Sequence, residues 1–132
     1  MKTIKFFSII TLSLLLFGCP EPEGDEIQAV IKVKNDSEIN LYTLSKGKNP
    51  ELYNWAPNDN YFIPIGEVFE YGGNYYSSLS GGIKLYIWLF DEEVINNNSW
   101  EDIIENNMYL IRYDLTLDDL ENMNWEIEYS GE

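Results

Sequence analysis

Few side chains in this sequence could carry out covalent chemistry. The 132 residues contain no His and a single Cys, Cys19. His is the commonest general base and metal ligand, and one Cys cannot form an internal disulfide or a Cys-based metal site. Ser45 and Lys48 have the Ser-x-x-Lys spacing of some acyl-transferring serine enzymes. However, Gly47 and Pro50 oppose the helix that would bring these two side chains together, so the sequence predicts no enzyme, no metal and no cofactor.

Carboxylates are abundant, but they indicate no specific site. The chain has 23 Asp and Glu against 8 Lys and Arg, which gives a net charge of −15. Close carboxylate pairs are inevitable at this density, so they do not indicate a glycoside hydrolase. The segments 58–60 and 91–98 offer oxygen ligands for calcium, but neither has the EF-hand spacing, and solvated loops are the simpler interpretation. The acidic charge also argues against nucleic-acid binding, which needs clustered Lys and Arg.

Aromatic side chains near Asn and Gly are the remaining candidates for a binding site. The residues are Tyr53, Trp55, Tyr75 and Tyr76. Exposed rings beside amide groups can stack on sugars, which would make the chain a glycan-binding module. Buried rings that close the ends of a small β-domain explain the same pattern and are the favoured interpretation, because aromatic rings dominate small cores. The sequence leaves both interpretations open.

The start of the chain has the pattern of a bacterial export signal. Two Lys precede a nearly all-apolar run, 6–17, which is too short to span a bilayer. The next residues, Leu16-Phe17-Gly18-Cys19, resemble the lipoprotein box, in which an aliphatic and a small residue precede a lipid-carrying Cys. The resemblance implies that Cys19 is acylated and that the chain is cut before it. We therefore expect residues 1–18 to be a lipoprotein signal peptide.

An acidic segment, 19–26, follows this signal. Its two Pro, one Gly and four carboxylates cannot pack in a core, which predicts an extended tether. The segment resembles the surface-export signal of lipoproteins from the Bacteroidota, and a plain linker is the alternative. The resemblance implies an outer-membrane lipoprotein that faces the cell surface, whereas a plain linker leaves a periplasm-facing domain open. Acyl chains on Cys19 would be the contact with the membrane.

Residues 27–132 read as a single domain in which apolar and polar residues alternate, as in β-strands. Segments 27–33 and 39–44 alternate in this way, and the Asn-Asp-Ser-Glu turn between them favours a hairpin. Segment 83–90 is apolar on both faces, which is typical of a strand covered on both sides, although the pattern does not separate a central from an edge strand.

Two short helices interrupt the strands. They begin at Ser99 and Thr116, which can cap the first-turn amides, and acidic residues follow each cap. The remaining apolar segments are short and separated by Gly, Pro and Asn. We predict a mainly β fold, an antiparallel β-sandwich of six to seven short strands with one or two short helices.

Three strings in the domain carry a resemblance. They are Val33-Lys34-Asn35-Asp36-Ser37, Ser99-Trp100-Glu101-Asp102-Ile103 and Arg112-Tyr113-Asp114-Leu115-Thr116-Leu117-Asp118-Asp119-Leu120. In this order they resemble a group of small, uncharacterised Bacteroidota outer-membrane lipoproteins. The resemblance implies a location and a fold class but no chemistry. We therefore predict a surface-exposed lipoprotein that acts as a non-catalytic binding or interaction module for an unknown protein or glycan partner.

Overall fold

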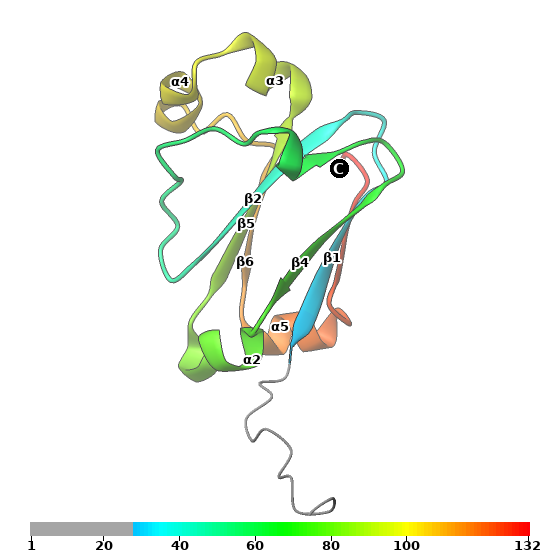
Figure 1. The fold of residues 1–132 in the computed structure, drawn as a ribbon, viewed down its shortest axis with the longest axis vertical. Helices are drawn as coiled ribbons and strands as arrows, with labels where there is room; N and C mark the ends of the chain where they lie inside the picture. The colour runs from blue at the N-terminus through cyan, green and yellow to red at the C-terminus, as the bar shows by residue number, and fades with distance from the viewer. Residues whose placement is uncertain (1–27) are drawn as a thin grey trace, which may run out of the picture.

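The alternating segments form two β-sheets that face each other in the computed structural model, which describes residues 28–132 (Figure 1). The described strands are β1 (Ala29–Asn35), β2 (Leu41–Gly47), β3 (Phe62–Ile63), β4 (Val68–Gly73), β5 (Leu85–Asp91), β6 (Ile111–Leu115) and β7 (Glu126–Tyr129). The described helices are α2 (Tyr75–Ser78), α3 (Glu92–Asn97), α4 (Trp100–Glu105) and α5 (Leu117–Asn122), with single 3-10 turns η1 (Asp59–Tyr61) and η2 (Ser80–Gly82). The predicted signal peptide, Cys19 and the acidic tether lie outside the described residues.

The strands divide into sheet A, with the order β4-β1-β7, and sheet B, with the order β3-β2-β5-β6. Every pair is antiparallel except β1 with β7, which is parallel. The predicted mainly β sandwich is therefore confirmed, with seven strands in residues 28–132. The two helices predicted from the sequence are α4 and α5. Residues 28–132 also contain two short helices that were not predicted, α2 and α3. The Asn run at the end of α3 hides that helix from sequence reasoning, because Asn is a weak helix former.

The predicted hairpin between segments 27–33 and 39–44 is wrong. β1 pairs with β4 and β7, whereas β2 pairs with β3 and β5. The turn between β1 and β2 carries the chain from one sheet to the other, so the two strands face each other across the sandwich. Ile31 and Leu41 are fully buried in the same core cluster. A hairpin and a crossover would both bury these apolar faces, so alternation alone does not distinguish them.

Asn35 holds this crossover in place. The residue is 0 % exposed, and its side-chain amide donates to the carbonyl oxygens of Ile39 (2.8 Å) and Ile63 (3.0 Å). Its Oδ1 accepts from the Ser37 backbone N–H at 3.1 Å and from the Ser37 hydroxyl at 2.6 Å. The side chain thus satisfies backbone groups from both ends of the turn and from β3, which buried backbone requires.

β5 is a central strand that is covered on both faces. Its inward residues Leu85, Ile87 and Leu89 lie in the core between the sheets. Its outward residues Trp88 and Phe90 lie in a second cluster on the outer face of sheet B. The chain between β2 and η1, which we call the 48–58 loop, covers this outer face together with α3 and α4 (Figure 1). The prediction of a strand covered on both sides is confirmed, and the structure places it between β2 and β6.

Polar side chains at the helix starts act as caps. Ser99 accepts from the Asp102 N–H, and Thr116 forms a capping box with Asp119. The two segments considered as calcium ligands also contain caps, because Asn58 begins η1 and Asp91 begins α3. Within residues 28–132, no cluster of three or more acidic or Cys side chains is arranged to hold a metal ion. No helix in the same range is long and apolar enough to cross a membrane.

The segment between α5 and β7 is a tight turn with an unusual backbone. Asn124 and Trp125 have φ values of 55° and 61°, and the Glu126 N–H donates to the Met123 carbonyl. A bulky residue in this left-handed region is strained. The Trp125 carbonyl accepts from the Lys32 N–H at 2.8 Å, so the turn is attached to β1. The final strand, β7, begins directly after this turn, at Glu126.

Candidate binding site on the outer face of sheet B

The four aromatic residues selected from the sequence lie in two separate places. Tyr75 and Tyr76 are on α2, at the opposite end of the sandwich from α3 and α4 (Figure 1). Both rings pack against Trp125, with centroids 6.1 and 5.3 Å away. Tyr75 is 9 % exposed and Tyr76 is 37 % exposed, and burial raises the pKa of the Tyr75 hydroxyl. This arrangement matches rings that close an end of the domain.

Tyr53 and Trp55 lie on the 48–58 loop and stack on each other. Their ring centroids are 4.6 Å apart with an interplanar angle of 20°, and the Tyr61 ring lies 5.8 Å from Trp55. The Tyr53 hydroxyl donates to the Ser45 carbonyl of β2 at 2.8 Å, and burial raises its pKa. Trp55 remains 41 % exposed, so the stack presents one indole ring to solvent.

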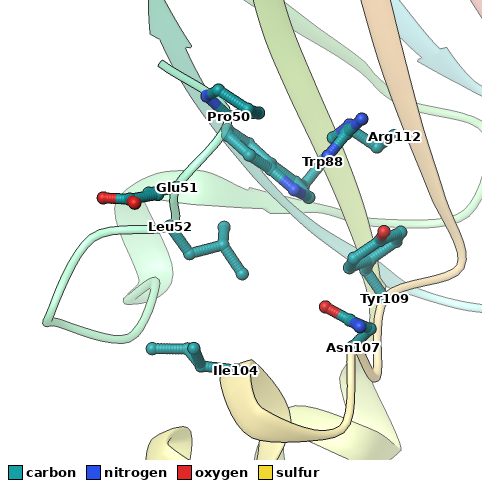
Figure 2. A pocket seen from close by; sticks show the side chains of 8 residues that line it. All are labelled: Pro50, Glu51, Leu52, Trp88, Ile104, Asn107, Tyr109 and Arg112. Carbon is teal, nitrogen blue, oxygen red and sulfur yellow. The ribbon is translucent and has the colours of Figure 1, made fainter.

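A pocket of about 370 Å³ lies on the other side of the same loop, against the outer face of sheet B (Figure 2). Its lining residues are Pro50, Glu51, Leu52, Trp88, Ile104, Asn107, Tyr109 and Arg112. The volume lies within the ~300–1,000 Å³ usual for small-molecule sites. The lining mixes aromatic, aliphatic, acidic, amide and basic groups around one space.

Four parts of the chain form one side of this pocket, and the 48–58 loop forms the other. Trp88 of β5 and Arg112 of β6 are cross-strand partners, so they stand side by side on the outer face of the sheet. Ile104 comes from α4, while Asn107 and Tyr109 come from the turn between α4 and β6. Asn107 adopts a φ of 50°, a conformation that Asn tolerates better than most residues.

The 48–58 loop forms the opposite wall and is tied to the sheet by hydrogen bonds. Lys48 N–H donates to the Lys84 carbonyl at 3.0 Å, and the Lys46 ammonium donates to the Glu51 carbonyl at 2.9 Å. The Trp100 indole of α4 donates to the Tyr53 carbonyl at 2.8 Å. The loop is therefore attached to β2, to the segment before β5 and to α4, which holds the pocket open at a defined width.

Trp88 has an unused hydrogen-bond donor at this pocket. The residue is 1 % exposed, yet its indole N–H makes no hydrogen bond to any residue in 28–132. No enclosed side-chain nitrogen or oxygen in this range lacks a partner, so the indole nitrogen must be in contact with the pocket solvent. Figure 2 shows the nitrogen on the side of the ring that faces the enclosed space. A donor that no protein group pairs and that solvent reaches can pair with water or with a ligand.

The charged groups at the rim are partly neutralised. Arg112 donates to both carboxylate oxygens of Asp114, through Nε at 2.8 Å and Nη2 at 3.1 Å. Its guanidinium also lies 5.5 Å from the centroid of the Tyr86 ring. Glu51 carries the opposite charge on the loop wall. The Tyr109 hydroxyl and the Asn107 amide make no hydrogen bond within residues 28–132, so both can pair with a ligand.

Sequence reasoning missed the residues of this pocket. Trp88 was recognised as part of an apolar strand face, but nothing in the sequence says which part of that face stays uncovered. Arg112, Asn107 and Glu51 are ordinary surface residue types. The only sequence signal pointing to this region was the aromatic content of the 48–58 loop, which selected the neighbouring Tyr53 and Trp55.

A smaller hollow of about 220 Å³ lies on the outer face of sheet A. Lys32 and Lys34 of β1 line it together with Val68, and Glu126 and Glu128 stand beside the two lysines on β7. Its lining of alternating opposite charges is typical of the solvent-facing side of a sheet. The pocket on sheet B is therefore the stronger candidate.

Comparisons with known proteins add no assignment to this geometry. No protein-family model matches the chain, and neither a curated protein nor a solved structure matches it either.

Proposed function

We propose that this chain is a non-catalytic binding module whose ligand occupies the pocket on the outer face of sheet B. The observation that carries the proposal is the indole N–H of Trp88, which faces the pocket and makes no hydrogen bond within residues 28–132. Because the ring is otherwise buried and solvent reaches the nitrogen, a ligand acceptor can replace water there at a fixed position.

The side chains in the pocket support binding rather than bond cleavage. A general base or acid needs a pKa tuned by burial or a neighbouring charge. Within residues 28–132, Glu51 is the one carboxylate that lines the pocket, and no second carboxylate stands beside it in the lining. The pocket instead combines apolar walls with several separate hydrogen-bonding groups, as binding sites do.

We further propose that the module is held at the outer membrane through lipid on Cys19 and faces the cell surface. This part rests on the lipoprotein-box resemblance and on the acidic segment 19–26. Labelling of intact cells with a membrane-impermeant reagent tests it. Strong labelling supports the surface location, whereas labelling only after permeabilisation places the domain in the periplasm.

A second candidate uses the stacked rings on the other side of the loop. The Trp55 ring is exposed on one side and stacks on Tyr53 on the other, an arrangement that suits stacking on a glycan. In this alternative the ligand would contact Trp55 and leave the pocket unchanged.

Indole N–H resonances distinguish these sites because each of the four Trp side chains gives its own signal. We would screen the ¹⁵N-labelled protein in mild detergent against mixtures of saccharides, amino-acid amides, short peptides, nucleosides and short fatty acids. A shift of the Trp88 signal supports the pocket, and a shift of Trp55 alone supports the second candidate. The Trp125 indole, which packs against α2 at the opposite end of the sandwich, is the internal reference. If no mixture moves either signal, the binding proposal is wrong.

A further inference from the structure

The free groups in the pocket define the chemistry of its ligand. The Trp88 indole can only donate, so the ligand must present a hydrogen-bond acceptor at that wall. Glu51 belongs to the loop wall, but Figure 2 shows its carboxylate pointing away from the enclosed space, so the carboxylate sets no requirement for the ligand. Asn107 and Tyr109 can do both. A ligand with several groups that each donate and accept meets all of these requirements.

The charges favour a neutral ligand. Arg112 already has two of its nitrogens bonded to Asp114, so little of its charge is left for an anion. The net charge of −15 and the nearby Glu51 also repel anions. A cation would be repelled by the positively polarised Trp88 N–H and by the Arg112 guanidinium. Neither sign of charge is therefore matched by the pocket.

The apolar side chains that line the pocket favour a ligand with a hydrocarbon face. Leu52 and Ile104 stand on facing walls, and the half-buried Tyr109 ring lies between them and the strands (Figure 2). The electron-rich face of an aromatic ring attracts the positively polarised hydrogens of C–H groups. A sugar ring has such C–H faces, and its hydroxyl groups radiate from the edge, where the polar groups of the pocket stand.

A peptide is a poorer fit to this location. Extended peptides bind by adding a strand to an open sheet edge, where they pair with backbone N–H and C=O groups. The pocket instead lies on the face of sheet B, over β5 and β6, and offers side-chain groups. We propose that the pocket binds a neutral sugar, with the Trp88 N–H donating to a hydroxyl or ring oxygen; this inference rests on the proposed binding function.

The test is a titration of the ¹⁵N-labelled protein in detergent, monitored at the indole signals. The neutral probes are methyl glycosides of glucose, galactose, mannose, xylose and N-acetylglucosamine, with the disaccharides cellobiose, maltose and lactose. Glucuronate, galacturonate and glucosamine are the charged counterparts. We expect a saturable shift of Trp88 with at least one neutral sugar, at least tenfold weaker binding of its charged counterpart, and no shift of the distant Trp125.

Three variants check the residues by calorimetric titration. Trp88→Phe keeps a ring but removes the N–H, and we expect at least tenfold weaker binding. Because Trp88 is buried, its replacement can also destabilise the fold, so Asn107→Gly provides a second test. Glycine accepts the positive φ, and only the exposed amide is lost. We expect three- to tenfold weaker binding with an unchanged Tm. Tyr76→Ala, an exposed ring on distant α2, is the matched control and should bind normally.

The outcomes separate the two levels of the proposal. A Trp88 shift with peptides, nucleosides or fatty acids but with no neutral sugar would overturn the sugar and leave the binding module standing. No Trp88 shift with any class would overturn both. A sugar that binds Trp88→Phe and Asn107→Gly as tightly as the unchanged protein would show that it binds elsewhere, which also overturns the inference.

Discussion

Replacing Asn35 by Ala tests the reasoning about the crossover between the sheets. The change removes four hydrogen bonds, two to the carbonyls of Ile39 and Ile63 and two from Ser37. The Ser37 hydroxyl can still donate to the Ile39 carbonyl, which it already does at 3.1 Å. Two buried backbone groups therefore lose their side-chain partner, the Ile63 carbonyl and the Ser37 N–H.

Each orphaned group costs about 1–3 kcal/mol, and we expect a loss of about 3 kcal/mol in the free energy of unfolding. That is a large part of the ~5–15 kcal/mol typical of a domain. Urea unfolding followed by Trp fluorescence measures it, and the midpoint should fall while the slope stays unchanged. Asn97→Ala, an exposed position at the end of α3, is the matched control and should change the stability by less than about 0.5 kcal/mol.

The Asn35→Asp variant tests the same network through the direction in which stability changes with pH. Its carboxylate would face two carbonyl oxygens without a donor, so burial would raise its pKa in the folded protein above that of the unfolded chain. The destabilisation should be complete above the folded-state pKa and should shrink as the pH falls towards the unfolded-state pKa. Wild-type stability for Asn35→Ala, or a pH-independent Asn35→Asp, would refute the assigned hydrogen-bond network.

Three further predictions concern other parts of the domain. Trp125→Gly should be about 1 kcal/mol more stable to urea than Trp125→Ala, because both lose the ring and only glycine relieves the positive φ; the reverse order would show that the turn is unstrained. Thr116→Ala should cost about 1 kcal/mol through the lost cap of α5. The hydrogen bond from the Thr116 N–H lowers the pKa of Asp119 below its ordinary value of 3.8. The ionised Asp119 therefore stabilises the fold above that pH, and this stabilisation is lost in more acidic solution. Asp119→Asn should flatten the acid side of a stability–pH profile, and an unchanged profile would contradict the capping box. Trp55→Ala should lower stability by less than about 1 kcal/mol because the ring is 41 % exposed, and a variant that is unfolded before heating would instead identify Trp55 as core.

The local features of the fold were predictable because each depends on a few neighbouring residues. Ser99 and Thr116 were identified as caps from their own type and the acidic residues that follow. The strand 83–90 was identified as covered on both sides from its two apolar faces. These features need no knowledge of distant parts of the chain.

The strand pairing was not predictable in the same way. The turn Asn35-Asp36-Ser37 at the end of β1 has a composition that suits a hairpin. The buried Asn35 side chain, however, donates to the carbonyl of Ile63, which is 28 residues away in the sequence. That contact exists only when β3 is already in place. Pairing between distant strands is a property of the whole fold, which residue patterns report only weakly.

The pocket shows the same limit. It joins the 48–58 loop, β5, β6 and the turn after α4, and none of these segments carries a motif. Tyr53 and Trp55 were selected for their ring chemistry, and they lie on the same loop as the pocket wall. The sequence could not show that Tyr75, chosen for the same reason, is in the core.

The position of β1 determines how the domain responds to mechanical load. β1 is the first strand and lies between β4 and β7, and it starts at the end of the sandwich opposite to the chain's C-terminus (Figure 1). A pull on its first residue acts along the strand, whereas its hydrogen bonds to both neighbours run across it. The two ladders are then sheared as a whole instead of being opened one bond at a time. A domain that is tethered by its N-terminal side and pulled by whatever it holds would resist extension along this axis far better than one tethered by an edge strand.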